Sequence, residues 1–129
     1  MFTSLVKPLF DGPIDIVGDV HGEIGALHSL LTHLGYDSEG DHPQGRRLVF
    51  VGDLTDRGPD SPAVVKLVKD LIDQGRAQCV LGNHELNILL HLTKHDNHWF
   101  FGRDSPPGGP SPAVLLNTQA ERSAVVDFF

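Results

Sequence analysis

Several features are scarce in this sequence of 129 residues, and each shortage excludes a class of protein. The single cysteine, Cys79, excludes an internal disulfide and a cysteine-rich zinc site. No stretch stays apolar for the ~18 residues that a membrane-spanning helix needs, which argues against a membrane partner. The apolar run at the N-terminus is too short for a secretion signal, so we expect a cytoplasmic protein.

Basic residues are also in the minority. Ten Lys and Arg stand against 17 Asp and Glu, which gives a formal net charge of −7. Binding of a nucleic-acid polymer needs clustered Lys and Arg, so this balance argues against such a partner. The excess of acidic residues fits a solvated surface, or carboxylates gathered to bind cations. The eight histidines allow metal binding without proving it.

Apolar residues alternate between two periodicities along the chain. Short runs at 14–17, 48–51 and 77–81 are typical of strands, and a glycine follows each of them. Helical spacing follows each run, over 23–34, from Ser61 to Gly75, and over 84–93. The resulting β-α-β-α-β-α order predicts an α/β fold in one domain, with a mostly parallel sheet.

Local signals refine this prediction. Ser61 is predicted to cap the second helix, with Pro62 at its first position. Cys79 lies in the third predicted strand and is expected to be a small buried residue. The segment 102–112 is rich in Gly, Pro and Ser and is predicted to be a loop, and the pattern over 118–129 favours a further helix.

Polar side chains follow each predicted strand, in the sequences GDVHG at 18–22, GDLTDRG at 52–58 and GNHE at 82–85. In a parallel sheet the carboxyl ends of the strands meet at one edge, and ligands bind there. We therefore expect these three motifs to lie close together.

The first two motifs carry carboxylates that suit metal binding. Asp19 and His21 stand on one turn and can face one ion, although Asp19 alone is equally well explained as a helix cap. Asp53 can bridge two cations, and Asp56 can accept a hydrogen bond from a histidine. Arg57 has the geometry to bind phosphate oxygens, and an ordinary surface pair with Asp56 is its alternative.

The third motif adds an amide and an imidazole. Asn83 offers a neutral oxygen ligand or, alternatively, caps the helix that follows. His84, at the start of that helix, has the chemistry to protonate a leaving oxygen. Taken together, the three turns make a mixed oxygen and nitrogen ligand set for hard or borderline ions. Two such ions ~3.5–4 Å apart polarise a phosphate and activate water at neutral pH.

In their order and spacing these motifs resemble the signatures of the calcineurin-like metallophosphoesterases, in the phosphoprotein phosphatase branch. That branch includes serine/threonine protein phosphatases and bacterial symmetrical diadenosine tetraphosphatases. The resemblance implies an α/β fold, namely the βαβαβα half of that family's β-sandwich with flanking helices. It covers residues 15–90, and Leu54-Thr55, where eukaryotic members usually have Tyr-Val, suggests a bacterial member. The family's later metal-binding histidines have no counterpart, so residues 1–129 are expected to be a truncated, N-terminal half of the domain.

The resemblance also implies a role for each motif residue. The implied metal ligands are Asp19, His21, Asp53 and Asn83. Among them, Asp53 would bridge both ions, and Asn83 would also contact the substrate. His84 would be the general acid, Asp56 would support it, and Arg57 would bind phosphate.

These observations predict a two-metal phosphoesterase. Manganese is the expected metal, with iron, zinc or magnesium as alternatives. The predicted substrate is a phosphate monoester, as in a protein serine/threonine phosphatase, with a symmetrical dinucleoside tetraphosphate as the alternative. A further alternative is an incomplete half-domain that binds metal without catalysis. Exposed apolar surface on such a half would favour self-association.

The remaining histidines and aromatic residues have simpler interpretations. His91 and His95 have helical i, i+4 spacing that can bind a metal, but a polar helix surface explains them better. His28 and His33 are expected to be structural or exposed. The aromatic run at 99–101 is expected to be core, or packing for the other half of the domain.

Overall fold

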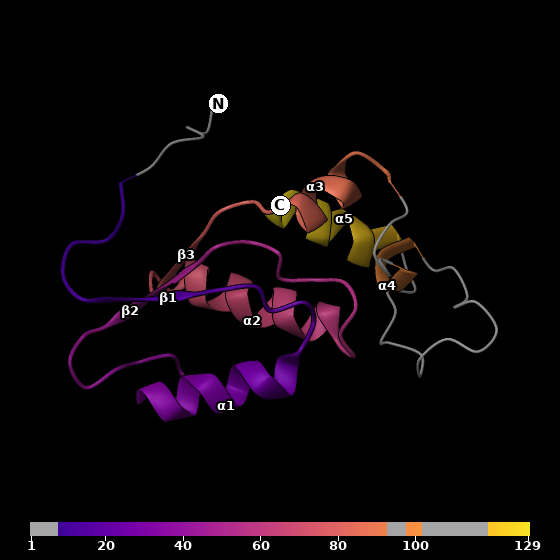
Figure 1. The fold of residues 1–129 in the computed structure, drawn as a ribbon. Helices are drawn as coiled ribbons and strands as arrows, with labels where there is room; N and C mark the ends of the chain where they lie inside the picture. The colour runs from indigo at the N-terminus through magenta and orange to yellow at the C-terminus, as the bar shows by residue number, and fades with distance from the viewer. Residues whose placement is uncertain (1–7, 93–97, 102–118) are drawn as a thin grey trace.

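The computed structural model describes residues 8–92, 98–101 and 119–129 (Figure 1). Three parallel strands form its sheet in the order β1-β2-β3. Their bounds are Ile14–Val17 for β1, Arg47–Phe50 for β2 and Ala77–Cys79 for β3. The predicted parallel α/β arrangement is therefore confirmed.

Helices follow each strand. Their bounds are Ile24–Leu34 for α1, Ser61–Asp73 for α2, Asn83–Leu89 for α3, His98–Phe101 for α4 and Gln119–Phe128 for α5. Because the strand order follows the chain order and such crossovers share one hand, α1 and α2 lie on the same face of the sheet (Figure 1). Within the described residues, none of these helices has the length and apolar character needed to cross a membrane.

The main core lies between the sheet and these two helices. On the sheet side it contains Leu48 and Phe50, both fully buried, and on the α2 side Val64 and Val68. Cys79 is only partly buried and packs against this core, which agrees in part with the buried position predicted for it.

The opposite face of the sheet is only partly covered, since Val49 on it is buried while other apolar side chains are exposed. Because side chains alternate along a strand, Ile16, Val51 and Val80 share this face. They are 66%, 39% and 56% exposed among the described residues. This is an exposed apolar surface of the kind that the sequence predicted, and self-association through it stays a prediction.

A second apolar cluster lies beside the first. It consists of Val65, Ile88, Trp99, Phe100 and Val125. These residues come from four helices, and Figure 1 shows α5 running next to α3. The packing role predicted for the aromatic run is confirmed for Trp99 and Phe100. The predicted loop 102–112 lies outside the described residues.

Some predicted boundaries need correction. The cap of α2 is Asp60, whose side chain accepts a hydrogen bond from the Ala63 N–H, and Ser61 is the first helical residue. The Ser61 hydroxyl is buried and accepts a hydrogen bond from the Asp56 N–H instead. Strand β2 lies one residue earlier than predicted. Strand β3 stops at Cys79 because its partner strand ends at Phe50.

Helix α3 is shorter than predicted, because its C-terminus is closed by a left-handed residue. His91 has φ +56°, its N–H bonds to the Ile88 carbonyl, and the Leu92 N–H bonds to the Asn87 carbonyl. This is the Schellman arrangement, which Gly35 and Gly75 provide at the ends of α1 and α2. His91 therefore lies beyond the helix, so the helical position predicted for it is wrong. His95 lies outside the described residues.

Candidate active site

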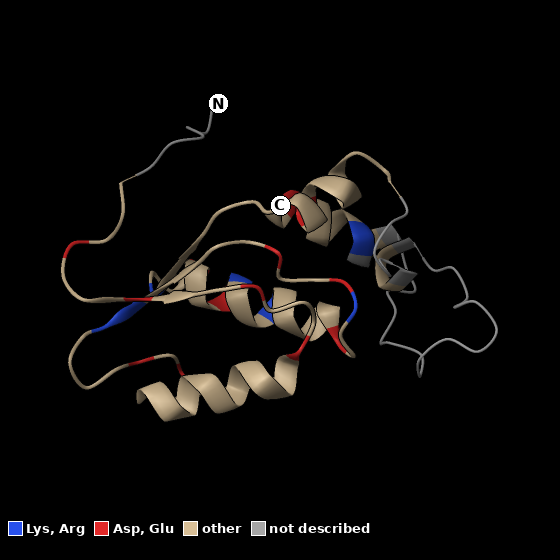
Figure 2. Cartoon of the chain, viewed as in Figure 1, with Lys and Arg blue, Asp and Glu red and all other residues tan. Residues whose placement is uncertain are grey.

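The loops after β1 and β2 are bound together through the backbone. The carbonyl of Asp53 accepts hydrogen bonds from the N–H groups of Val20 and His21, at 3.1 and 3.0 Å. The Leu54 carbonyl accepts from the Gly22 N–H at 2.8 Å. The first two motifs thus meet at the carboxyl edge of the sheet, as predicted. Figure 2 shows acidic positions on these loops and a basic position at the start of β2.

Glycine allows this close approach. A Cβ atom on Gly52, whose φ is +89°, would overlap the backbone of Gly82. A Cβ atom on Gly58 would overlap the carbonyl oxygen of His21. These contacts explain why the motifs carry glycine at these positions, since any side chain would push the three loops apart.

The motif residues themselves have a strained backbone. His21, Asp53, Asp56 and Arg57 have φ values of +48°, +50°, +74° and +72°. With His91 they are the five non-glycine residues of the described chain that have positive φ. Such residues cost free energy and persist only where the surroundings hold them, which is typical of functional sites.

A buried carboxylate holds the second and third motifs together. Glu85 is 1% exposed, and its Oε2 accepts hydrogen bonds from the N–H groups of Asp53 and Gly82 at 2.9 and 3.0 Å. Its Oε1 accepts from the Leu54 N–H at 2.7 Å. Glu85 therefore fixes the backbone on which Asp53 stands.

At the first motif, His21 and Asp19 face each other. The Nδ1 atom of His21 lies 3.0 Å from the Thr55 carbonyl oxygen, which can only accept, so Nδ1 carries a proton. In the neutral ring, Nε2 is then an acceptor, and it lies 3.5 Å from Oδ2 of Asp19. Asp19 does not cap α1, because the cap is Glu23, without a side-chain bond. Two acceptors that face each other suit a shared cation.

At the third motif, the amide of Asn83 faces the carboxylate of Asp53. One terminal amide atom lies 3.0 Å from both carboxylate oxygens. In the orientation that satisfies both groups this atom is the amide nitrogen, and it donates to both oxygens. With a cation between the two groups, the amide would turn over and present its oxygen instead. Neighbouring oxygens of an octahedral ion with bonds of 2.0–2.1 Å lie roughly 3 Å apart, so the spacing fits such an ion. The cap of α3 is Gly82 rather than Asn83.

These two pairs form a partial ligand set. In the part of the chain that the structure describes, no three His, Cys, Asp or Glu side chains lie close enough together to bind one ion. In the same residues no Lys or Arg lies within ion-pair distance of Asp19 or Asp53. The residues present fit divalent ions by chemistry and spacing, while a complete site needs further ligands.

The Asp56 carboxylate is fully buried and does not form the surface pair that was the alternative at this motif. Its Oδ2 lies 2.9 Å from Nδ1 of His84, and its Oδ1 accepts from Nε1 of Trp99 at 2.7 Å. Burial raises the pKa of Asp56, and the hydrogen bonds from Trp99 and His84 offset part of that rise. The predicted bond between Asp56 and a histidine is confirmed as a contact. The His84 ring also lies edge-on to His21, with centroids 4.5 Å apart.

The other predicted positions are simpler. Arg57 is exposed, next to the buried Asp56. His28 and His33 are exposed on α1, as expected. Burial raises the pKa of the Cys79 thiol to about 12, so it is a poor nucleophile and metal ligand at neutral pH.

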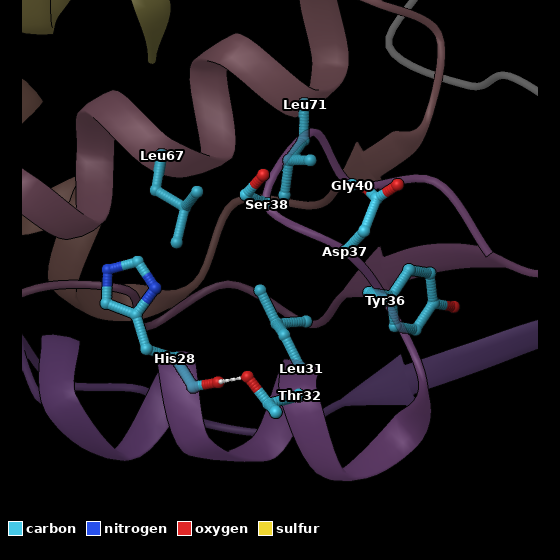
Figure 3. A pocket seen from close by; sticks show the side chains of 9 residues that line it. All are labelled: His28, Leu31, Thr32, Tyr36, Asp37, Ser38, Gly40, Leu67 and Leu71. Atoms are coloured by element: carbon cyan, nitrogen blue, oxygen red, sulfur yellow. Dashed lines mark hydrogen bonds between the residues drawn. The ribbon is translucent and has the colours of Figure 1, made fainter.

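A small hollow lies elsewhere in the molecule. It has a volume of about 270 Å³ and lies between α1, α2 and the loop after α1 (Figure 3). Leu31, Leu67 and Leu71 line it, together with His28 and Asp37. It contains none of the motif residues, so we place the candidate active site at the strand ends and not here.

Three residues of the site were not identified from the sequence. Glu85 belongs to a motif that was recognised, but its backbone contacts depend on the loop after β2. Trp99 was expected only to pack, and Ser61 only to cap a helix. A buried indole N–H usually has a hydrogen-bond acceptor, and that rule could have drawn attention to Trp99.

Comparisons with known proteins show the family of this chain. The family profile described as calcineurin-like phosphoesterase matches residues 12–120. The asymmetrical bis(5'-nucleosyl)-tetraphosphatase PrpE of Oceanobacillus iheyensis is 50% identical over 74 residues, which are 55% of this chain and 30% of that protein. The protein of the same description from Bacillus subtilis is 42% identical over 81 residues, which are 60% of this chain and 33% of that protein.

A solved structure supports the same relationship. The crystal structure of a protein described as a presumed diadenosine tetraphosphatase aligns with a TM-score of 0.53 and 40% sequence identity, over 65% of this chain and 34% of that one. The chain thus spans about a third of the length of the relatives it matches. The resemblance inferred from the three motifs is confirmed. This chain belongs to the calcineurin-like phosphoesterase family, whose members generally use divalent metal ions.

Proposed function

We propose that this chain carries the first part of a two-ion phosphoesterase site that hydrolyses a dinucleoside polyphosphate. One observation carries the proposal. The Asp53 carboxylate stands on a strained loop, held by Glu85, with the Asn83 amide 3.0 Å from both of its oxygens and no Lys or Arg paired to it in the described chain. A carboxylate held in this way is prepared for a cation.

The proposed ligands divide into two sets that share one residue. Asp19 and His21 would bind one ion and Asn83 the other, and Asp53 would contribute to both once its side chain moves toward the first pair, since the three do not yet form one group in the described chain. The ions would supply electrostatic stabilisation of the phosphoryl group and an acidified water. We propose Mn²⁺, with Fe, Zn²⁺ and Mg²⁺ as alternatives that suit the same oxygen and nitrogen ligands.

The chain's own side chains would do the remaining work. The exposed guanidinium of Arg57 would bind the phosphoryl oxygens of the substrate, and the Asn83 side chain would contact the substrate beside it. His84 would protonate the leaving oxygen from Nε2, because its Nδ1 faces Asp56. The Asp56 carboxylate would hold the imidazole in that tautomer and stabilise its protonated form.

The choice of substrate comes from the relatives. The similar proteins are described as asymmetrical tetraphosphatases, and the similar structure as a presumed diadenosine tetraphosphatase. We therefore place a dinucleoside polyphosphate ahead of the phosphoprotein that the sequence alone favoured. Because the chain covers about a third of these proteins, its substrate stays a proposal. Hydrolysis of phosphate monoesters is the second candidate, supported by the three shared motifs.

The test is hydrolysis of diadenosine tetraphosphate and of p-nitrophenyl phosphate by the 129-residue chain with each metal. Asymmetrical cleavage yields AMP and ATP, whereas symmetrical cleavage yields two ADP. We expect Asp53→Asn to lower kcat roughly 10³-fold, because an ion contributes several kcal/mol to the transition state. The control is Asp73→Asn, an exposed carboxylate on α2, which should leave kcat unchanged.

The outcomes separate the alternatives. Hydrolysis of p-nitrophenyl phosphate alone would favour the monoesterase. A folded chain that binds Mn²⁺ and hydrolyses neither compound would support the incomplete half-domain. The cytoplasmic location and the absence of nucleic-acid and membrane partners stay predictions.

A further inference from the structure

We propose that Trp99 is a positioning residue, whose indole N–H holds the Asp56 carboxylate in the orientation that fixes His84. The proton-donor role of His84 rests on the proposed function, whereas the fixing of its ring does not. The inference begins from a contact that packing alone does not explain. The Nε1 atom of Trp99 lies 2.7 Å from Oδ1 of Asp56, and both residues are buried.

The side chains of Trp99 and His84 each contact a different oxygen of the Asp56 carboxylate. Oδ1 accepts from Trp99, and Oδ2 pairs with Nδ1 of His84. Rotation of the carboxylate would break at least one of these bonds in a site that is shielded from water. An unsatisfied acceptor in such a site is costly, so the two bonds hold each other in place.

Trp99 is itself held firmly. It is 1% exposed and belongs to the second apolar cluster, where its ring lies against Phe100 with centroids 5.8 Å apart. That cluster includes Ile88, four residues after His84 and therefore on the same side of α3. Trp99 thus contacts both the partner of His84 and the cluster beneath the helix that carries His84.

A phenylalanine would fill this apolar position without donating a hydrogen bond. Trp99→Phe therefore removes the N–H while it keeps an aromatic ring in the cluster. Phe100→Leu is the matched control, because it alters the same cluster at a residue whose side chain cannot bond to Asp56. A purely structural role for Trp99 predicts that the two variants behave alike.

The first measurement does not depend on activity. The ring ¹⁵N signals of His84, assigned with His84→Asn, report its tautomer in the metal-free chain. We expect Trp99→Phe to shift them toward an average of both tautomers and Phe100→Leu to leave them at the wild-type positions. In addition, Trp99 is the single tryptophan, so its indole N–H gives one signal, which Asp56→Asn should move.

The second measurement compares leaving groups. A weakened general acid matters most for a poor leaving group, so Trp99→Phe should lower kcat for phenyl phosphate about tenfold and for 2,4-dinitrophenyl phosphate less than about twofold, with KM unchanged. His84 signals in Trp99→Phe that match those of Phe100→Leu would overturn the proposal. If the wild-type chain hydrolyses neither ester, the monoesterase alternative fails, diadenosine tetraphosphate still decides the proposed function, and the His84 signals alone decide the role of Trp99.

Discussion

The sheet has a carboxylate near each of its two ends. Asp15 lies in β1, near the amino ends of the strands, and Asp53 lies in the loop after β2, at their carboxyl ends. Asp15 accepts hydrogen bonds from Arg46 at 2.9 and 3.1 Å and from the Tyr36 hydroxyl at 2.7 Å. Asp53 accepts from the backbone N–H of His84 and faces the amide of Asn83. Asp15 is paired with the cationic Arg46, whereas no Lys or Arg of the described residues pairs with Asp53.

The backbone is also regular at Asp15 and strained at Asp53. Asp15 lies in regular strand geometry, whereas Asp53 has φ +50° on a loop held by the buried Glu85. Interactions at the amino end are satisfied and contribute to stability. At the carboxyl end the strained backbone opposes stability, and the facing acceptors of Asp19 and His21 leave a place for an ion. Substitutions at the two ends should therefore affect different properties.

The largest effect on folding is expected where the strained end is held. Glu85→Gln leaves one acceptor oxygen for three backbone N–H groups and turns an NH₂ group toward one of them. We expect a loss of about 1–3 kcal/mol in the free energy of unfolding, measured by urea denaturation of the metal-free chain. Glu39→Gln, at an exposed position, is the control and should change nothing. Equal stability of the two variants would mean that Glu85 does not support the site.

An intermediate effect is expected at the amino end. Asp15→Asn should lower the free energy of unfolding by about 1 kcal/mol at pH 7 with no effect on metal binding. Arg46, with help from Tyr36, lowers the pKa of Asp15 below its ordinary value of 3.8. The stabilising charge is therefore present above pH 3.8 and is lost as the pH falls through the lowered pKa. Urea denaturation of both chains should show their difference shrinking in that acid range, and a constant difference would contradict this.

The smallest effect on folding is expected at Asp53. In the metal-free chain, Asp53→Asn should change the free energy of unfolding by less than about 0.5 kcal/mol, since Asn keeps the acceptor for the His84 N–H. Addition of Mn²⁺ at 100 times its Kd should stabilise the wild-type chain by about 2.7 kcal/mol and the variant much less. Thermal unfolding with and without Mn²⁺ measures both. Equal stabilisation of the two chains would place the ion elsewhere.

Much of the fold could be predicted because its signals are local. The ends of α1 and α2 were readable from Gly35 and Gly75, which adopt left-handed backbone at little cost. The end of α3 was not, because His91 takes the same conformation without a sequence signal. The cap of α2 is Asp60 rather than Ser61, because the Ser61 hydroxyl already accepts a hydrogen bond from the Asp56 N–H in the loop before it.

The candidate site likewise contains residues that could be predicted from the sequence and residues that could not. The motif residues were predictable because a strand followed by Gly-Asp or Gly-Asn places each of them at one edge of the sheet. The supports of the site come from tertiary contacts, and these leave little trace in the sequence. Trp99 is 43 residues from Asp56, and Glu85 is 32 residues from Asp53, so neither pairing is visible from local patterns.

The sequential strand order has a consequence for how the site comes into being. Each strand pairs only with the strand just before or after it along the chain, so the sheet can grow from the N-terminus during synthesis. The first two motifs can then meet as soon as β2 has joined β1. Asp53 acquires its support only when residue 85 arrives, and Asp56 only when residue 99 arrives. Competence for metal and for proton transfer would thus appear late in assembly, in that order, after the sheet already exists.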